Sequence, residues 1–272
     1  MRIGFIGAGN MGGAILKGII GKQFVMPENV YVFDTNASVV EKWKKEYDVN
    51  SSACSAELVK ECDWVLLCVK PIFLKKVLVE IRPYLNSEKK VISIAAGWSV
   101  EMLEKAMGDS GAQLLRVMPN TPALVGEGVL ALCEETSLSA EDFVWAQKLF
   151  GTLGVVQIIP ERLIDAIIAV SGSSPAYVFM FIDAMADAAV KLGMPRKMAI
   201  QCAAQAVMGS AKMVLETKLH PAELKDQVCS PGGTTIEAVQ VLEENGLRSA
   251  VIKAMIACAE KNMLMTNRGS DE

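Results

Sequence analysis

A glycine-rich stretch near the N-terminus constrains the fold of this chain more than any other feature. An apolar run, Ile3 to Ile6, is followed by Gly7, Gly9 and Gly12 in the pattern G-x-G-x-x-G, and residues 11–20 then read as a helix. In this pattern the first glycine permits a tight turn, the second lets the backbone approach a pyrophosphate, and the third lets helix and strand pack closely. The stretch therefore predicts a phosphate-binding turn, with the N–H groups of the helix N-terminus facing the phosphates.

An acidic residue supports this interpretation. A second apolar run, 30–33, ends in Asp34, and a carboxylate about 20 residues beyond the motif can accept hydrogen bonds from a ribose 2′-OH. It repels a 2′-phosphate, and no Lys or Arg stands beside it in Asp34-Thr35-Asn36. We therefore expect NADH to be accepted at least as well as NADPH. A glycine turn that only closes a β–α corner is the alternative. The expected cofactor contacts here are Gly7, Ala8, Gly9, Asn10, Met11, Gly12 and Asp34.

Apolar runs and helical segments alternate through the first part of the chain. Strands are also expected at 64–69, 91–94, 114–118, 129–133 and 155–159, and helices at 38–47, 56–61, 72–81, 100–107 and 140–150, with Ser99 as an N-cap. Unbroken apolar strands are typical of a parallel sheet covered on both faces. The alternation predicts an α/β fold with a doubly wound, mostly parallel sheet, a Rossmann domain, over residues 1–160.

Three turns in this domain are further candidates for cofactor contact, because ligands of such sheets bind at the carboxyl ends of the strands. The small residues of Ala95-Ala96-Gly97 let a nicotinamide ring approach the backbone, although a turn that packs helices is equally compatible with them. Lys70 and Pro71 end another strand, where Lys70 is either a cofactor contact or a solvated surface residue. Asn120, between Pro119 and Pro122, can bond a ribose or a carboxamide.

Beyond residue 160 helix-forming residues dominate, which predicts an all-helical domain over residues 161–272. Helices are expected at 163–169, 176–192, 195–215, 221–228, 235–244 and 248–266, followed by a frayed tail over 267–272. Faces rich in Ala and Met, as at 184–189 and 199–211, are apolar almost all round, which implies burial on more than one side. We therefore expect a homodimer at least. A self-contained helical bundle is the alternative.

Composition excludes several classes of partner. The net charge of −4 provides no basic field to attract nucleic acid or an anionic membrane. The seven cysteines are scattered and include no C-x-x-C, which favours reduced thiols in a cytoplasmic protein and no metal site. The apolar stretch 163–190 carries Asp165, Asp183 and Asp187, so we expect no membrane span.

A second ligand site is expected between two helices of the C-terminal half, in Ser230-Pro231-Gly232-Gly233-Thr234-Thr235. Two glycines expose backbone N–H groups, three hydroxyls add donors and acceptors, and the next helix directs its positive end toward the loop. This combination suits an anion such as a carboxylate. Thr234 can also serve as the N-cap of that helix.

At this loop the chain resembles the pyrroline-5-carboxylate reductases. The run from Leu224 to Thr235, with Leu242-Glu243 after it, is similar to the signature of that family. Further family blocks follow the family order and extend the resemblance over the whole chain. They are Val69-Lys70-Pro71, Ala95-Ala96-Gly97, Met118-Pro119-Asn120-Thr121-Pro122 and Ser171-Gly172-Ser173-Ser174-Pro175-Ala176-Tyr177.

The resemblance implies an NAD(P)H-dependent oxidoreductase that reduces the cyclic imine (S)-1-pyrroline-5-carboxylate to L-proline, the last step of proline biosynthesis. It also implies a Rossmann domain joined to a helical dimerisation domain, with dimers assembled into decamers and helices of both subunits beside the site. The nicotinamide would lie near Ala95 to Gly97 and Asn120. The substrate would be held by Ser230, Gly232, Gly233 and Thr234, with the hydroxyl of Thr235 at the ring nitrogen as the catalytic group.

The residue inventory is compatible with imine chemistry. His220, the only histidine, precedes Pro221 in a connecting loop, where we expect a surface or capping role. Reduction of a carbonyl usually requires a positioned acid, whereas an imine can enter already protonated. Hydride transfer then needs mainly proximity, orientation and a carboxylate anchor. Two residues depart from the family pattern: Ser174 replaces a glycine at a helix entry, and Ser55 stands where many members carry an asparagine near the ribose.

Two other functions remain open at this point. The first is a reductase of the β-hydroxyacid dehydrogenase or imine reductase type, which would carry a catalytic lysine or aspartate at the start of the second domain. Here Ser171 to Ser174 offer only small residues. The second is a nonenzymatic dinucleotide sensor, for which the Ser230 to Thr235 loop would be superfluous.

Overall fold

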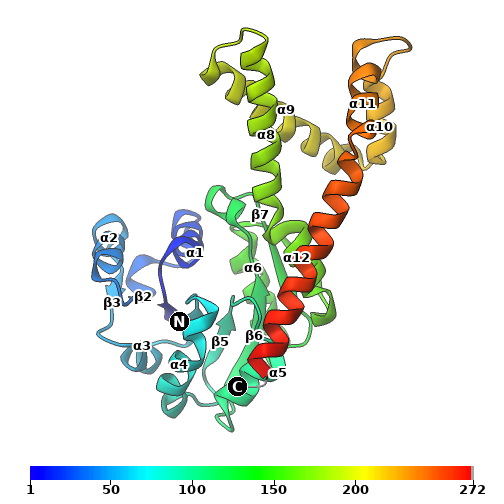
Figure 1. Cartoon of the computed structure of the whole chain (residues 1–272). Helices are drawn as coiled ribbons and strands as arrows, with labels where there is room; N and C mark the ends of the chain where they lie inside the picture. The colour runs from blue at the N-terminus through cyan, green and yellow to red at the C-terminus, as the bar shows by residue number, and fades with distance from the viewer. Residues whose placement is uncertain (271–272) are drawn as a thin grey trace. The chain divides into compact units, whose positions relative to one another are not determined.

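The computed structural model describes residues 1–270, and the side chains of residues 1–266. The chain divides into two compact units (Figure 1). The first, here called the sheet unit, comprises Met1–Gly172 and the C-terminal segment that begins at Cys258. The second, the helical unit, is Ser173–Ala257. The expected domain boundary after residue 160 follows the change in composition and stays a prediction.

The sheet unit contains an eight-stranded sheet in the order β3-β2-β1-β4-β5-β6-β7-β8, which confirms the predicted mostly parallel α/β fold. One pairing, β6 with β7, is antiparallel. The physical reason is the connection between them, a short 3₁₀ segment, Thr121–Val125 (η3), whereas a parallel return needs a long crossover. The strands are β1 Ile3–Ile6, β2 Val30–Phe33, β3 Asn50–Ser51, β4 Trp64–Leu67, β5 Lys90–Ser93, β6 Gln113–Met118, β7 Gly128–Cys133 and β8 Gly154–Ile159.

Successive side chains of the buried strands enter two separate apolar clusters. Phe5 and Leu66 belong to one cluster together with residues of α1 and α6, whereas Ile6 and Leu67 belong to the other with residues of α3, α4 and α5. This alternation arises because neighbouring strand residues point to opposite faces. The helices are α1 Asn10–Gly21, α2 Ala37–Tyr47, α3 Ser55–Glu61, α4 Pro71–Ile81, α5 Val100–Met107 and α6 Ala140–Gly151.

The strand register gathers the turns that were expected to bind the cofactor. Ile6 pairs with Phe33 on one side and with Leu67 on the other, and Leu67 pairs with Ser93. These residues end β1, β2, β4 and β5, so the turns that follow the four strands leave the sheet at the same level. Helix α1 also contacts η3, which follows Asn120.

Some element boundaries differ from the expectations. β4 ends at Leu67 rather than at residue 69, because the backbone bends at Val69 before α4, although Cys68 still donates its N–H to the carbonyl oxygen of Ile6. β3 was not foreseen, since its polar pair Asn50–Ser51 lacks an apolar pattern. The helix expected at 163–169 is a short one, α7 Ile164–Ile167, flanked by a 3₁₀ turn, Glu161–Leu163 (η4), and a π-helical turn, Ile168–Gly172.

The helical unit confirms the helices expected after residue 173. They are α8 Ser174–Lys191, α9 Arg196–Thr217, α10 Pro221–Val228, α11 Thr234–Glu244 and the first part of α12 Leu247–Ser270. Helix α8 begins at Ser174, so serine in place of the family glycine is compatible with helix entry. The expected tail over 267–272 was wrong for residues 267–270, whose backbone continues α12; residues 271–272 lie outside the described residues.

Two helical segments have the length and composition of membrane spans, Glu161–Lys191 with a mean hydropathy of 1.5 and Arg196–Thr217 with 1.2. Helices that are apolar on several sides because they pack between subunits have the same properties. Helices α8 and α9 contact each other within the helical unit, where Figure 1 shows them as neighbours.

Candidate functional site

The glycine turn has the geometry of a phosphate-binding turn. Gly7 has a φ of +91°, and a Cβ there would lie 2.8 Å from the carbonyl oxygen of Cys68 at the end of β4. A Cβ on Gly12 would lie 2.3 Å from the carbonyl oxygen of Gly7, so the close approach of α1 requires glycine. At Gly9, by contrast, an added Cβ would meet no atom within 4 Å among the described residues beyond its own neighbours in the chain. The turn is therefore closed against β4 and open at Gly9, the N-cap residue of α1.

Asp34 is tied to this turn by backbone hydrogen bonds. Its Oδ2 accepts the N–H of Ala8 at 2.9 Å, and its Oδ1 accepts the N–H of Asn36 at 2.9 Å. The half-buried carboxylate is thus fixed beside the glycine turn. Each carboxylate oxygen has capacity for a further hydrogen bond, so this arrangement leaves room for a ribose hydroxyl.

The turns after β4 and β5 are connected by a tryptophan that the sequence did not single out. The indole Nε1 of Trp98 lies 3.3 Å from the carbonyl oxygen of Pro71, to which it donates. Pro71 is the first residue of α4, and the exposed Lys70 is its N-cap residue. Gly97 has a φ of +74°, and a Cβ there would lie 3.6 Å from the Cβ of Met265 in α12. The two candidate cofactor turns are therefore held together on one side, and α12 lies against one of them.

Asn120 is 6 % exposed, and both ends of its amide are engaged. Its Nδ2 donates to the carbonyl oxygen of Ser171 at 3.0 Å, and its Oδ1 accepts the N–H of Val129 at 2.9 Å. The side chain thus ties the end of β6 to β7 and to the π-helical turn. A cofactor contact of Asn120 stays a prediction, and it would use the second lone pair of Oδ1 or the backbone.

The expected anion loop lies in the helical unit as a tight turn. The N–H of Gly233 donates to the carbonyl oxygen of Ser230 at 3.0 Å, and Gly232 between them has a φ of +65°. Proline second and glycine third is the pattern of a type II turn. Gly233, not Thr234, is the N-cap residue of α11, so the capping role considered for Thr234 was wrong. Because Gly233 has no side chain, the first N–H groups of α11 are left for a ligand.

The hydroxyl-bearing residues of this loop lie at the positive end of α11. Ser230 and Thr234 are exposed, whereas Thr235, the second residue of the helix, is half-buried. His220 lies at the start of α10, where its Nδ1 accepts the N–H of Ala222 at 3.2 Å. This confirms the expected capping role of the histidine. Among residues 1–270, no group of three or more His, Cys, Asp and Glu side chains could hold a metal ion.

Burial determines the protonation state of three cysteine thiols in the sheet unit. Burial raises the pKa of Cys62 to about 12 and that of Cys133 to about 12, from an ordinary value near 9. Burial also raises the pKa of Cys68, at the end of β4 beside the glycine turn. These thiols are protonated at neutral pH and are poor nucleophiles.

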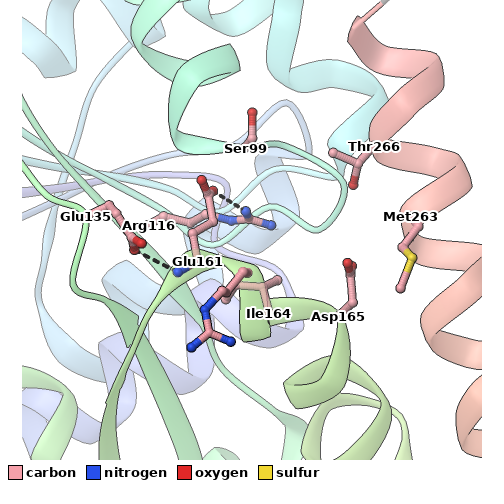
Figure 2. A pocket seen from close by; sticks show the side chains of 9 residues that line it. Ser99, Arg116, Glu135, Glu161, Ile164, Asp165, Met263 and Thr266 are labelled. Carbon is pink, nitrogen blue, oxygen red and sulfur yellow. Dashed lines mark hydrogen bonds and ion pairs between the residues drawn. The ribbon is translucent and has the colours of Figure 1, made fainter.

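A separate cavity of about 430 Å³ lies in the sheet unit, where Arg116 of β6 meets the η4 turn (Figure 2). Glu161 Oε1 accepts the Nη1 of Arg116 at 2.5 Å and the N–H of Val100 at 2.7 Å. The N–H of Glu161 in turn donates to Glu135. Because these polar groups bind one another, we assign the cavity a structural role. The remaining lining residues are Ser99, Arg162, Ile164, Asp165, Met263 and Thr266.

Ser55 is buried at the first position of α3. It is one of the two residues noted above as departing from the family pattern. Its Oγ has no hydrogen-bond partner among the described residues, and nothing in the structure explains this serine. The sequence did not single out Trp43, Trp98 or the Arg116–Glu161 pair. Each acts through a contact with a distant segment, which no local pattern encodes.

Comparison with known proteins identifies relatives over the whole chain. The family described as pyrroline-5-carboxylate reductase dimerisation matches residues 161–265, and that described as NADP oxidoreductase, coenzyme F420-dependent, matches residues 2–97. A pyrroline-5-carboxylate reductase of Escherichia coli is 49 % identical over 261 residues, which cover 96 % of this chain and 97 % of the relative. One from Methanosarcina acetivorans is 42 % identical and covers 96 % of each chain.

Solved structures resemble this chain over nearly its whole length. The pyrroline carboxylate reductase of Plasmodium falciparum with NADP bound has a TM-score of 0.89 and 34 % identity, covering 98 % of each chain. The pyrroline-5-carboxylate reductase of Coxiella burnetii has a TM-score of 0.88 and 32 % identity, covering 97 % of this chain and 98 % of the other. A reductive aminase of Aspergillus terreus, at 16 % identity and a TM-score of 0.59 over 99 % of this chain and 92 % of the other, shares the fold alone.

Proposed function

This chain belongs to the pyrroline-5-carboxylate reductase family, and we propose a role for each of its two candidate loops in that reaction. The protein is an NAD(P)H-dependent oxidoreductase of proline biosynthesis that reduces the C=N bond of 1-pyrroline-5-carboxylate to give L-proline. The observation that carries the proposal is the pairing, in one chain, of an open glycine turn at a strand end with an uncapped helix N-terminus that suits a carboxylate.

We propose that the Gly7–Gly12 turn binds the pyrophosphate of the cofactor and that Asp34 accepts the ribose hydroxyls. The open side of Gly9 supports the first assignment, and the fixed position of the carboxylate beside Ala8 supports the second. The remaining proposed contacts are Ala8, Asn10, Met11, Lys70, Pro71, Ala95, Ala96, Gly97 and Asn120. A bound reduced nicotinamide supplies the hydride for the reaction.

We further propose, from the charge of Asp34, that NADH is at least as good a cofactor as NADPH. Two backbone N–H groups hold its carboxylate, so it cannot easily turn away from a 2′-phosphate. Two unit charges 4 Å apart interact by roughly 4 kcal/mol at an effective dielectric constant of about 20, which is enough to bias the choice.

We propose that the substrate carboxylate binds at the N-terminus of α11, held by Ser230, Gly232, Gly233 and Thr234. The hydroxyl of Thr235 then orients the ring nitrogen. The imine enters as an iminium ion, hydride adds to its carbon, and the electrons of the C=N bond become the lone pair of the amine nitrogen. No side chain has to supply a proton in this step, which agrees with the capping role of the only histidine.

We also propose that the protein is cytoplasmic and assembles through the helical unit into dimers and then decamers, without a membrane or nucleic-acid partner. Large apolar side chains exposed on α8 and α9 support assembly, among them Phe179 at 63 % and Met180 at 73 %. Burial of such a surface between copies of the chain would explain why these helices are apolar almost all round.

The role of Thr235 is tested by comparing two substitutions. Thr235→Val keeps the shape but removes the hydroxyl, and we expect kcat/KM for the imine to fall roughly 100-fold while the affinity for the cofactor is unchanged. Thr235→Ser keeps the hydroxyl and serves as the matched control, with activity within a few-fold of the native protein. Full activity in the valine variant would remove Thr235 from the mechanism.

A further inference from the structure

The glycine turn is fixed by a residue outside the fingerprint, and we propose that Trp43 of α2 positions this turn for the cofactor. Trp43 is 6 % exposed, and its indole Nε1 donates to the carbonyl oxygen of Ala8 at 2.8 Å. The inference rests on the proposed binding of the pyrophosphate at Gly7–Gly12. It concerns how the turn is held ready, which neither the motif nor the family relationship assigns to Trp43.

Both backbone polar groups of Ala8 are anchored. Its N–H donates to Asp34 Oδ2 at 2.9 Å, and its carbonyl oxygen accepts the indole of Trp43. Its side chain is 1 % exposed, so the residue is enclosed as well as hydrogen-bonded. The two peptide planes that meet at Ala8 therefore each have one fixed orientation.

One of these planes carries a donor for the ligand. The carbonyl of Ala8 and the N–H of Gly9 belong to the same peptide group, and in a trans peptide the two point in opposite directions. Because Trp43 binds the carbonyl of Ala8 within the apolar core, the N–H of Gly9 points the opposite way, away from that core, and Gly9 itself is exposed. Trp43 thus aims a backbone donor at the position proposed for the pyrophosphate.

Gly13, the residue after the last glycine of the motif, leaves space for the indole of Trp43. A Cβ on Gly13 would lie 2.3 Å from the Cζ2 atom of Trp43 and 3.3 Å from the carbonyl oxygen of Ala8. Gly13 is not part of the G-x-G-x-x-G pattern, so the motif does not account for it. Its lack of a side chain is explained by the packing of the indole against α1.

Removing the indole donor should weaken cofactor binding without changing the chemistry. Trp43→Phe keeps an aromatic ring but leaves the carbonyl of Ala8 without its partner, and we expect the Kd values of NADH and NADPH to rise by the same factor, roughly tenfold. The equality follows because both cofactors share the pyrophosphate. At saturating cofactor, kcat and the KM for the imine should stay unchanged. Isothermal titration calorimetry and steady-state kinetics measure these quantities.

A matched control separates positioning from stability. Trp145 is partly buried against the same apolar cluster and packs against Trp64 with ring centroids 4.3 Å apart. Trp145→Phe should lower the Tm yet leave both Kd values within twofold of the native protein. If Trp43→Phe also leaves both Kd values within twofold, the inference is wrong while the proposed function stands. If the native protein itself binds neither cofactor, the proposed function fails instead.

A second variant keeps the test decisive even if Trp43→Phe does not fold. Gly13→Ala favours the α1 helix by propensity but displaces the indole, so we expect a more than fivefold rise in both Kd values. In a Trp43→Leu background, which removes the clash, the same Gly13→Ala change should have an effect within twofold. An unchanged Kd in Gly13→Ala, or equal effects in both backgrounds, would contradict a role of Trp43 in holding the turn.

Discussion

At the scale of single residues, we assign the carboxylate of Asp34 both a structural role and a proposed binding role. It holds the glycine turn through Ala8, and in the proposed binding mode it would also accept the ribose hydroxyls of the cofactor. A carboxylate in this position discriminates by charge, because a ribose hydroxyl donates to it whereas a 2′-phosphate is repelled. Cofactor preference should therefore respond to substitution here more than to changes in the glycines.

Replacing Asp34 by Ser should shift the preference toward NADPH. We expect the ratio of kcat/KM with NADPH to kcat/KM with NADH to rise by about tenfold or more, since about 1.4 kcal/mol corresponds to a factor of ten. Asp34→Asn is the matched control, because it removes the charge but keeps an acceptor for the N–H of Ala8. Steady-state kinetics with both cofactors measures the ratio. A ratio that stays constant in both variants would show that Asp34 does not contact the 2′ position.

Buried thiols give a pH dependence of stability. The pKa of Cys62 is raised by burial to about 12, whereas an unfolded thiol ionises near 9. Above pH 9 the unfolded state loses this proton first, so the free energy of unfolding falls as pH rises from 9 toward 12, by up to roughly 1.4 kcal/mol per pH unit per thiol. Cys62→Ala should flatten this fall in urea titrations at pH 8, 9 and 10. An equal fall in the variant would contradict the assignment.

The structure shows contacts that could not be predicted from the sequence mainly at residues whose partners lie far away in the chain. The glycines and Asp34 follow a local pattern that the chemistry of the turn requires, and the structure bears out their geometry. The indole bond of Trp43 to Ala8 spans segments far apart in the sequence, and the engaged amide of Asn120 does the same. Such pairings depend on the completed fold, which a periodic pattern does not describe.

At the scale of elements, Glu161 connects three parts of the sheet unit. Its carboxylate binds Arg116 of β6 and the N–H of Val100 at the start of α5, and its own N–H binds Glu135 after β7. The side chain of Arg116 is 4 % exposed, so its charge depends on this partner. The η4 turn is thereby fixed to β6 of the sheet and to the start of α5.

Glu161→Gln should therefore destabilise the protein. The amide still accepts from Val100 but leaves the charge of Arg116 without compensation, and we expect a loss of about 2 kcal/mol, because the carboxylate itself is partly exposed. Glu135→Gln keeps an oxygen acceptor for the N–H of Glu161 and should cost less than half as much. Urea denaturation of both variants measures the difference, and equal stabilities would argue against the Arg116–Glu161 pair as the main contact.

Apolar periodicity was sufficient to predict the helices and most of the strands, because burial determines which faces are apolar. It did not predict β3, whose polar residues pair through backbone groups alone, or the antiparallel β6–β7 pairing, which follows from a short connection. The N-cap of α11 was misplaced because glycine and threonine are both good N-cap residues, and only the backbone angles decide between them.

At the scale of the whole molecule, the exposed apolar side chains of the helical unit indicate an interface with another copy of the chain. Methionine and phenylalanine side chains on α8 remain exposed in the isolated chain, and further ones follow on α9, such as Met208 at 57 %. Contiguous exposed apolar surface marks an interface in soluble proteins. The match of residues 161–265 to a dimerisation family agrees with this reading.

Met180→Glu should therefore shift the protein to smaller assemblies, because a buried unpaired carboxylate opposes association. Val79→Glu introduces the same charge at a residue that is 67 % exposed on α4 and should leave the assembly intact. Light scattering after size-exclusion chromatography measures the mass of each variant. A monomeric native protein, or an unchanged mass in Met180→Glu, would remove α8 from the interface.

The most direct test of the central claim is the oxidation of NADH and NADPH by purified protein supplied with 1-pyrroline-5-carboxylate, followed by the loss of nicotinamide absorbance and by the proline formed. We expect one proline for each cofactor oxidised, with NADH at least as effective as NADPH. If the protein binds the cofactor but oxidises neither NADH nor NADPH in the presence of the imine, the account is contradicted, because the glycine turn would then serve a different reaction.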